Sequence, residues 1–172
     1  MTMKKLFVLL LFIPIFSFGQ INFKDIMKIK NQEAFEKLMF DKQFSTYEKS
    51  DTTGIKSLYY ALNPITQDGG VASSHFASYT PSLMTFYFAF IRTGTSTNLY
   101  TGAVSEIGVI ANDYDKILRK AKRKCDFVKM YKVANNNYAC YTCKDADWGE
   151  AKYLGFAIIG GQGAIANFAY ID

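Results

Sequence analysis

The segment Leu83–Arg92 constrains the fold of this chain more than any other stretch of its sequence. Successive side chains of a β-strand point to opposite faces of a sheet. One face of this segment carries Met84, Phe86, Phe88 and Phe90. The other face is also largely apolar, with Thr85, Tyr87, Ala89 and Ile91. A strand that is apolar on both faces is typical of the interior of a sheet. The sequence therefore predicts a sheet with residues 83–92 near its centre.

Other strand-like runs predict that this sheet is antiparallel. Ile55–Leu62 lies between Thr53-Gly54 and Asn63-Pro64, two pairs of residues that are typical of turns. Phe44–Glu48 is a shorter run, and Val71–Tyr79 is ambiguous because it is rich in Ser and Ala. The abundance of aromatic residues, with 12 Tyr and 15 Phe in the whole chain, also favours strands.

Two hairpins are predicted in the C-terminal part. Their four strands are Phe127–Val133, Tyr138–Cys143, Tyr153–Ile159 and Ala164–Ile171. Asn135-Asn136 would form the first turn, because Asn tolerates the positive φ of tight hairpin turns. Gly160-Gly161-Gln162-Gly163 would form the second turn. A phosphate-binding loop needs a helix after its glycines, whereas a strand is predicted here.

One amphipathic helix is predicted before each group of strands. The first is Gln32–Lys42, with Asn31 as its N-cap and an apolar stripe formed by Phe35, Leu38 and Met39. A short helical lead, Asn22–Lys30, precedes it. The second helix would begin at Asn112 or Asp113 as its cap and would end near Lys124.

These elements predict an α+β fold, an antiparallel sheet with two helices packed on one face. Residues 20–172 are long enough for a single domain with a real core. The order of helix and then strands occurs twice, in the halves 20–110 and 111–172, which suggests a tandem unit of one helix and about four strands. The layout resembles that of small exported inhibitors of the β-lactamase inhibitory protein family. No motif is shared with that family, so the resemblance carries no functional residue to this chain.

The N-terminus has the pattern of a cleaved secretory signal peptide over residues 1–19. Lys4 and Lys5 precede an apolar run from Leu6 to Phe16, and Ser17 and Gly19 fill the small positions before a cleavage site. A spanning helix needs about 20 apolar residues, so a membrane anchor is disfavoured. We therefore expect an exported protein, periplasmic or extracellular, with no transmembrane segment in its mature chain.

The charge of the chain gives little indication of its partners. The net charge of +5 falls to +3 when Lys4 and Lys5 are removed. Most of that charge lies in one cluster, residues 119–124, which contains Arg119, Lys120, Lys122, Arg123 and Lys124. Such a cluster can attract nucleic acid or anionic lipid. We interpret it instead as the solvated face of a helix and expect no nucleic-acid partner.

The three cysteines, Cys125, Cys140 and Cys143, suggest one disulfide in an exported protein. Cys140 and Cys143 would point to opposite faces of a strand, which argues against a bond between them. The predicted hairpin places Val128 opposite Cys143, with Cys125 just before that point. We therefore hypothesise a Cys125–Cys143 disulfide. A zinc site formed by the three cysteines and His75 is the less favoured alternative, and we expect no metal and no cofactor.

Two functions are compatible with the sequence. The favoured one is a non-catalytic binding or inhibitory module, whose partner is another exported or envelope protein or a glycan. Aromatic residues would form its binding surface, with Tyr59, Tyr87, Tyr141, Trp148 and Tyr153 as candidates. The alternative is a cell-envelope hydrolase with an unrecognised site, for which His75, Asp145, Asp147 and Glu150 would be tested. No convergent catalytic constellation can be assembled from the sequence, and no catalytic residue is assigned.

The signal peptide yields the first testable prediction. Expression of the full chain in an exporting bacterium is expected to give a secreted or periplasmic protein that begins at Gln20. Intact-mass measurement and N-terminal sequencing check this. Replacing Gly19 with the bulky Leu should block or displace cleavage, whereas the same replacement at Gln20 should leave the cleavage site in place. A cytosolic product that retains residues 1–19 would contradict the interpretation.

Overall fold

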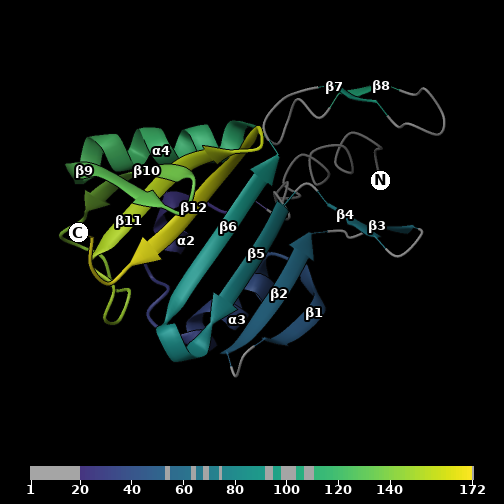
Figure 1. Cartoon of the computed structure of the whole chain (residues 1–172), viewed down its shortest axis with the longest axis horizontal. Helices are drawn as coiled ribbons and strands as arrows, with labels where there is room; N and C mark the ends of the chain where they lie inside the picture. Colours follow the sequence, from purple (N-terminus) through teal and green to yellow (C-terminus); the bar gives the residue numbers. More distant parts are fainter. Residues whose placement is uncertain are drawn as a thin grey trace, which may run out of the picture.

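The computed structural model describes residues 20–52, 55–62, 65–67, 70–73, 75–91, 95–97, 104–106 and 111–171. The predicted signal peptide, the turn residues 53–54 and 63–64, and the boundary between the halves at residue 110 lie outside these residues. Figure 1 shows the elements in chain order. They are α2 (Phe23–Ile26), α3 (Gln32–Asp41), β1 (Phe44–Thr52), β2 (Ile55–Leu62), β3 (Ile65–Gln67), β4 (Gly70–Ala72), β5 (His75–Thr80), the 3-10 turn η1 (Pro81–Leu83), β6 (Thr85–Ile91), β7 (Thr95–Thr97), β8 (Val104–Glu106), α4 (Ala111–Lys124), β9 (Asp126–Val133), β10 (Asn136–Thr142), β11 (Tyr153–Ile159) and β12 (Gln162–Phe168).

Eight of the described strands form one antiparallel sheet, in the order β1-β2-β5-β6-β12-β11-β10-β9. From one edge to the centre, the strands β1, β2, β5 and β6 stand in chain order. From the other edge to the centre, the strands β9, β10, β11 and β12 do the same. In each half the four strands come after one long helix, α3 or α4. The predicted antiparallel α+β fold is confirmed, and the two halves share the same order of elements. The pairs β3–β4 and β7–β8 are separate two-stranded additions.

The Phe-rich segment lies at the centre of the sheet, as predicted. β6 pairs with β5 on one side and with β12 on the other, and Phe86, Phe88 and Phe90 are fully buried. The strand begins two residues later than expected. Pro81–Leu83 forms a 3-10 turn, and Met84 ends that turn with a positive φ of 47° instead of continuing the strand.

All three described helices lie on the same face of the sheet, with α3 behind β2 and β5 and α4 behind β11 and β12 in Figure 1. The ring of Phe35 on α3 packs against Tyr60, Tyr79 and Phe88, with centroid distances of 5.7, 5.2 and 5.7 Å. On α4 the hydroxyl of Tyr114 donates to the carbonyl of Ala157 at 3.0 Å. A Cβ at position 163 of β12 would overlap the Tyr114 ring, so glycine at this position allows α4 to approach the sheet.

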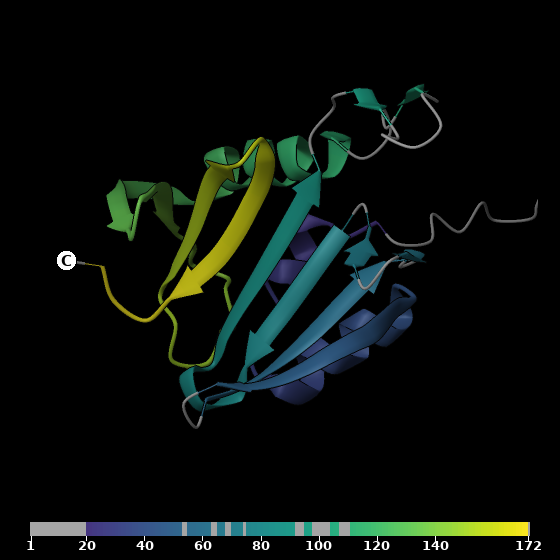
Figure 2. The same cartoon turned by 45° about the vertical axis from the view of Figure 1, so that its right-hand side comes forward.

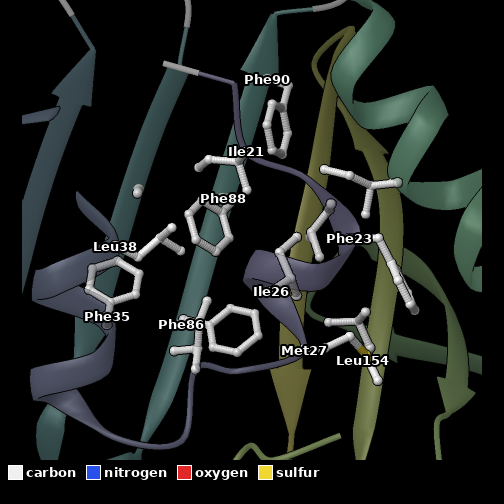
Figure 3. Packing of buried hydrophobic residues seen from close by; sticks show 14 of the residues in the cluster. Ile21, Phe23, Ile26, Met27, Phe35, Leu38, Phe86, Phe88, Phe90 and Leu154 are labelled. Atoms are coloured by element: carbon white, nitrogen blue, oxygen red, sulfur yellow. The ribbon is translucent and has the colours of Figure 1, made fainter. Parts of the chain in front are cut away.

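The lead segment around α2 fills the space between α3 and α4. Figure 3 shows its apolar side chains directed at the sheet. The buried members are Ile21, Phe23, Ile26, Met27 and Ile29. The loop between β10 and β11 holds this segment in place, because the indole N–H of Trp148 donates to the Ile26 carbonyl at 2.8 Å. The segment therefore belongs to the core and is more than a connection.

The β9–β10 hairpin differs in register from the prediction. Its turn is Ala134-Asn135, with Ala134 at a positive φ of 51°, and Asn136 already pairs with Val133. A bulge then shifts the register between Cys140 and Tyr141, so Asp126 pairs with Thr142. Val128 is therefore not opposite Cys143.

The predicted disulfide is nevertheless confirmed. The corrected register brings Cys125 next to Cys143, and the two form a disulfide with a Cα–Cα distance of 4.4 Å. The bond ties the end of α4 to the end of β10. Cys140 is the remaining cysteine, and it is buried with a free thiol.

Several other boundaries differ from the predicted ones. α4 begins at Ala111, so Asn112 and Asp113 lie in its first turn and neither is the residue before the helix. β1 extends to Thr52, beyond the predicted end at Glu48. β12 already begins at Gln162, because Gly160 and Gly161 alone form the turn, with φ of 55° and 81°.

The disulfide is expected to stabilise the fold measurably. It closes a loop with a sequence separation of 18, for which the loss of chain entropy in the unfolded state predicts about 3 kcal/mol. Urea unfolding with and without reductant should show this loss for the wild type. The Cys125→Ala/Cys143→Ala variant should unfold as the reduced wild type does and should not respond to reductant. Equal stability of the wild type in both conditions would contradict the assignment.

Candidate functional site

The face of the sheet opposite the helices is the candidate site, and we call it the open face. Tyr60, Phe88 and Ile165 belong to the core beneath the helices. Because side chains alternate along a strand, their neighbours in sequence point to the other face. No helix of the described residues covers that face, which is turned toward the viewer in Figure 1.

The open face combines small buried side chains with larger half-buried ones. Its small side chains are Ala61, Ala89, Ala157, Ala164 and Ala166. Its half-buried aromatic side chains are Tyr59, Phe76, Tyr87, Tyr131, Tyr153 and Phe168. A separate apolar cluster, centred on Tyr138 and Cys140, fixes part of this surface. The aromatic rings therefore rest on a floor of alanines in the central strands.

A pocket of about 210 Å³ opens on this face where β5, β6 and β12 adjoin. Its lining includes the hydroxyls of Ser78, Thr80 and Thr85, the rings of Tyr87 and Phe168, and Ala166. The Thr80 hydroxyl also shares a hydrogen bond of 3.0 Å with Ser57. The pocket therefore offers aromatic walls together with groups that can donate or accept hydrogen bonds.

Burial shapes the titration of the groups beside this pocket. Burial is the main cause that raises the pKa of Tyr138 to about 12, and interactions with Tyr87 and Cys140 contribute to the same shift. Burial also raises the pKa of Tyr87 and raises that of the Cys140 thiol to about 11. At neutral pH these groups are uncharged, so the open face presents hydroxyls and rings here and no phenolate.

The structure divides the predicted binding residues between the two faces. Tyr59, Tyr87 and Tyr153 lie half-buried on the open face. Tyr141 is only 5% exposed and packs on the helix side, edge-on to Phe127 and Phe156. Trp148 is 2% exposed. The interpretation of Tyr141 and Trp148 as surface residues is therefore wrong.

The residues that sequence reasoning missed are Phe76, Tyr131 and Phe168. The ring of Phe168 lies edge-on to Tyr131 and Tyr138, with centroid distances of 5.4 and 5.3 Å. The alternation of side chains along β12 already places Phe168 and Ile165 on different faces of the sheet. The signal that was needed is the pairing of β6 with β12, because it brings Phe168 beside Tyr87.

The residues considered for a hydrolase do not converge. His75 is buried, and its Nε2 lies 3.7 Å from the buried carboxylate of Asp113. Asp145, Asp147 and Glu150 are exposed in the loop that leads to β11, beside the opposite end of β12. The five residue steps of β12 from Gly163, on the side of His75, to Phe168, on the side of Tyr153, separate the two groups by about 17 Å, at roughly 3.4 Å per residue.

The cysteines do not form the alternative zinc site. Cys125 and Cys143 are bonded to each other, so neither thiolate is available as a ligand. Over the described part of the chain, no three His, Cys, Asp or Glu side chains are grouped as metal ligands would be. Likewise, none of the helices in that part is long and apolar enough to cross a membrane.

Comparison with known proteins adds no family to this picture. No protein-family model, no curated protein and no solved structure matches the chain.

The buried thiol of Cys140 gives a prediction for this face. Iodoacetamide at pH 8 should leave the folded protein unmodified, because the thiol is buried and its pKa of about 11 keeps it protonated. In denaturant one cysteine per chain should react, as mass spectrometry would show. Rapid alkylation of the folded protein would contradict the burial.

The same shift predicts a dependence of stability on pH. The thiol pKa rises from 9.0 when unfolded to about 11 when folded, so between these values the native state binds more protons. The free energy of unfolding should therefore decrease as the pH rises from 9 to 11. A Cys140→Ala variant, which lacks this group, should show a smaller decrease in urea unfolding over that range.

Proposed function

We propose that this protein is a non-catalytic binding module, and that it recognises another exported or envelope protein through the open face. The observation that carries the proposal is the pocket of about 210 Å³ lined by Tyr87 and Phe168, on a face that bears four further half-buried aromatic side chains. Aromatic residues that surround a pocket are typical of the centre of protein–protein interfaces.

The size of the pocket favours a protein partner. Sites for whole small molecules usually enclose about 300–1,000 Å³. A volume of about 210 Å³ is smaller than that range. It suits one side chain inserted by a partner, while Tyr59 and Tyr153 contact the surface around that side chain. The hydroxyls of Ser78 and Thr85 would then bond a polar end of the inserted group.

The rigidity of this face also supports binding. Its residues stand on paired strands of the central sheet, and the floor beneath them is buried alanine. A surface that is ordered before binding loses less conformational entropy when the complex forms. The disulfide and the predicted signal peptide fit a module that works outside the cytosol, in the periplasm or beyond the cell.

The test compares open-face variants with a matched control. Protein recovered after expression of the full chain is immobilised and exposed to envelope and culture fractions of the source organism. Tyr87→Ala removes a wall of the pocket, and Thr85→Lys fills the pocket with a charged side chain. Phe40→Ala is the control, since Phe40 is 82% exposed on α3, on the other side of the sheet. Circular dichroism and urea unfolding establish that each variant is folded.

We expect a protein that the wild type and the Phe40→Ala variant retain equally. The two open-face variants should retain at most a tenth as much, which corresponds to the loss of about 1.4 kcal/mol or more from a central contact. Retention that is unchanged in both open-face variants would contradict the proposal. Retention of a polysaccharide alone, lost in the same variants, would replace the protein partner with a glycan.

A further inference from the structure

A second concave surface lies on the helix side of the molecule, between the α2 lead and α4. This groove has a volume of about 880 Å³, within the range of ligand sites. Residues 20–24 and Lys42 form one wall, and α4 forms the other. Figure 3 shows Ile21 of the lead segment next to Phe90 of β6, and Phe23 on the side nearer to α4. The groove is separate from the open face, because the sheet lies between them.

The groove is strongly cationic. Its lining includes Lys24, Lys42, Lys116, Arg119, Lys120, Lys122 and Arg123. The carboxylate among its described lining residues is Asp113, which is buried against His75. Lys42 pairs with Asp25 at 3.0 Å. The other six cations take no part in the ion pairs found among the described residues.

The spacing of charges along α4 brings like charges close together. Lys116 and Lys120 are four residues apart, as are Arg119 and Arg123, so each pair lies on one side of the helix. Like charges at this spacing repel each other and destabilise a helix slightly. Lys24 adds further positive charge from another part of the chain, whereas the charge of Lys42 is paired with Asp25. A bound anion would relieve this repulsion.

The density of charge indicates which anion fits. Lys116 and Arg123 are seven residues apart, which is about 10 Å along a helix at 1.5 Å per residue. An extended acidic peptide places only about three side chains in that length, and these alternate between its two faces. A phosphate monoester carries a charge of about −1.5 to −2 and three acceptor oxygens. Two or three phosphates therefore match six cations, whereas peptide carboxylates do not.

We propose that the groove between α2 and α4 binds a ligand that carries two or more phosphate groups. Arg119 and Arg123 can each form two parallel hydrogen bonds to a phosphate, and the lysines supply point charges around it. Such phosphates could belong to a free oligophosphate or to the headgroups of an anionic lipid. The site goes beyond the proposed function, since it involves none of the open-face residues.

The experiment uses inorganic tripolyphosphate as its probe. Calorimetric titration into the protein recovered from full-chain expression is compared for two charge-matched double variants. Lys116→Gln/Lys120→Gln removes two charges from the groove. Lys132→Gln/Lys144→Gln is the control, because both lysines are exposed and neither lines the groove. Vesicles that contain phosphatidic acid, whose headgroup is a phosphate monoester, form the second arm in a sedimentation assay.

We expect tripolyphosphate to bind the wild type and the control alike, and the groove variant about tenfold or more weakly. Binding should weaken with rising NaCl, because salt screens exposed charges. Vesicles that bind and are displaced by tripolyphosphate would indicate a lipid headgroup, and vesicles that do not bind would indicate a free oligophosphate. The proposal is overturned by an absence of tripolyphosphate binding at millimolar concentration, or by an equal loss in both double variants. Loss of binding here does not bear on the open face, whose partner is tested with other variants.

Discussion

The pairing of β6 with β12 holds the two halves of this protein together. It joins strands that are more than seventy residues apart in the chain and places Phe88 opposite Ile165 at the centre of the sheet. A buried side chain reinforces the junction. The amide of Asn167 accepts from the backbone N–H of Phe86 at 2.7 Å and donates to the carbonyl of Met84 at 3.1 Å. The 3-10 turn interrupts the hydrogen bonds of the sheet at this point. The two bonds of Asn167 pair backbone groups that would otherwise be costly to bury.

Both proposed binding surfaces depend on this junction. One continuous sheet has one face covered by α2, α3 and α4, and its other face has no helix of the described residues on it (Figure 2). The pocket on the open face needs Tyr87 from β6 and Phe168 from β12 side by side. On the other face, the lead segment packs between the helices of the two halves and forms a wall of the cationic groove.

The sequence predicted the elements well and their contacts less well. Periodicity found α3, the central strand β6 and both hairpins, because amphipathic patterns reflect local geometry. The disulfide was predicted from a wrong register. One bulge and a shifted turn, with a positive φ at Ala134, moved Cys143 from Val128 to Cys125. Such features depend on packing and leave little trace in residue type.

The candidate site could be predicted only in part, for a similar reason. Which face a tyrosine occupies depends on the phase of its strand, and Tyr141 falls on the helix side. Trp148 could not be placed, because its partner Ile26 is 122 residues away. The cationic groove could not be predicted from the sequence either. The cluster at 119–124 was visible as a helix face, but the approach of Lys24 and Lys42 is a property of the fold.

Oxidative footprinting by mass spectrometry, with and without the captured partner, tests the role of the open face most directly. The account predicts that Tyr59, Tyr87 and Tyr153 lose labelling when the partner binds. Phe40, which is 82% exposed on α3 on the helix side of the sheet, should be labelled equally in both states. Protection of Phe40 together with unchanged labelling of the three open-face tyrosines would place the partner elsewhere and contradict the account.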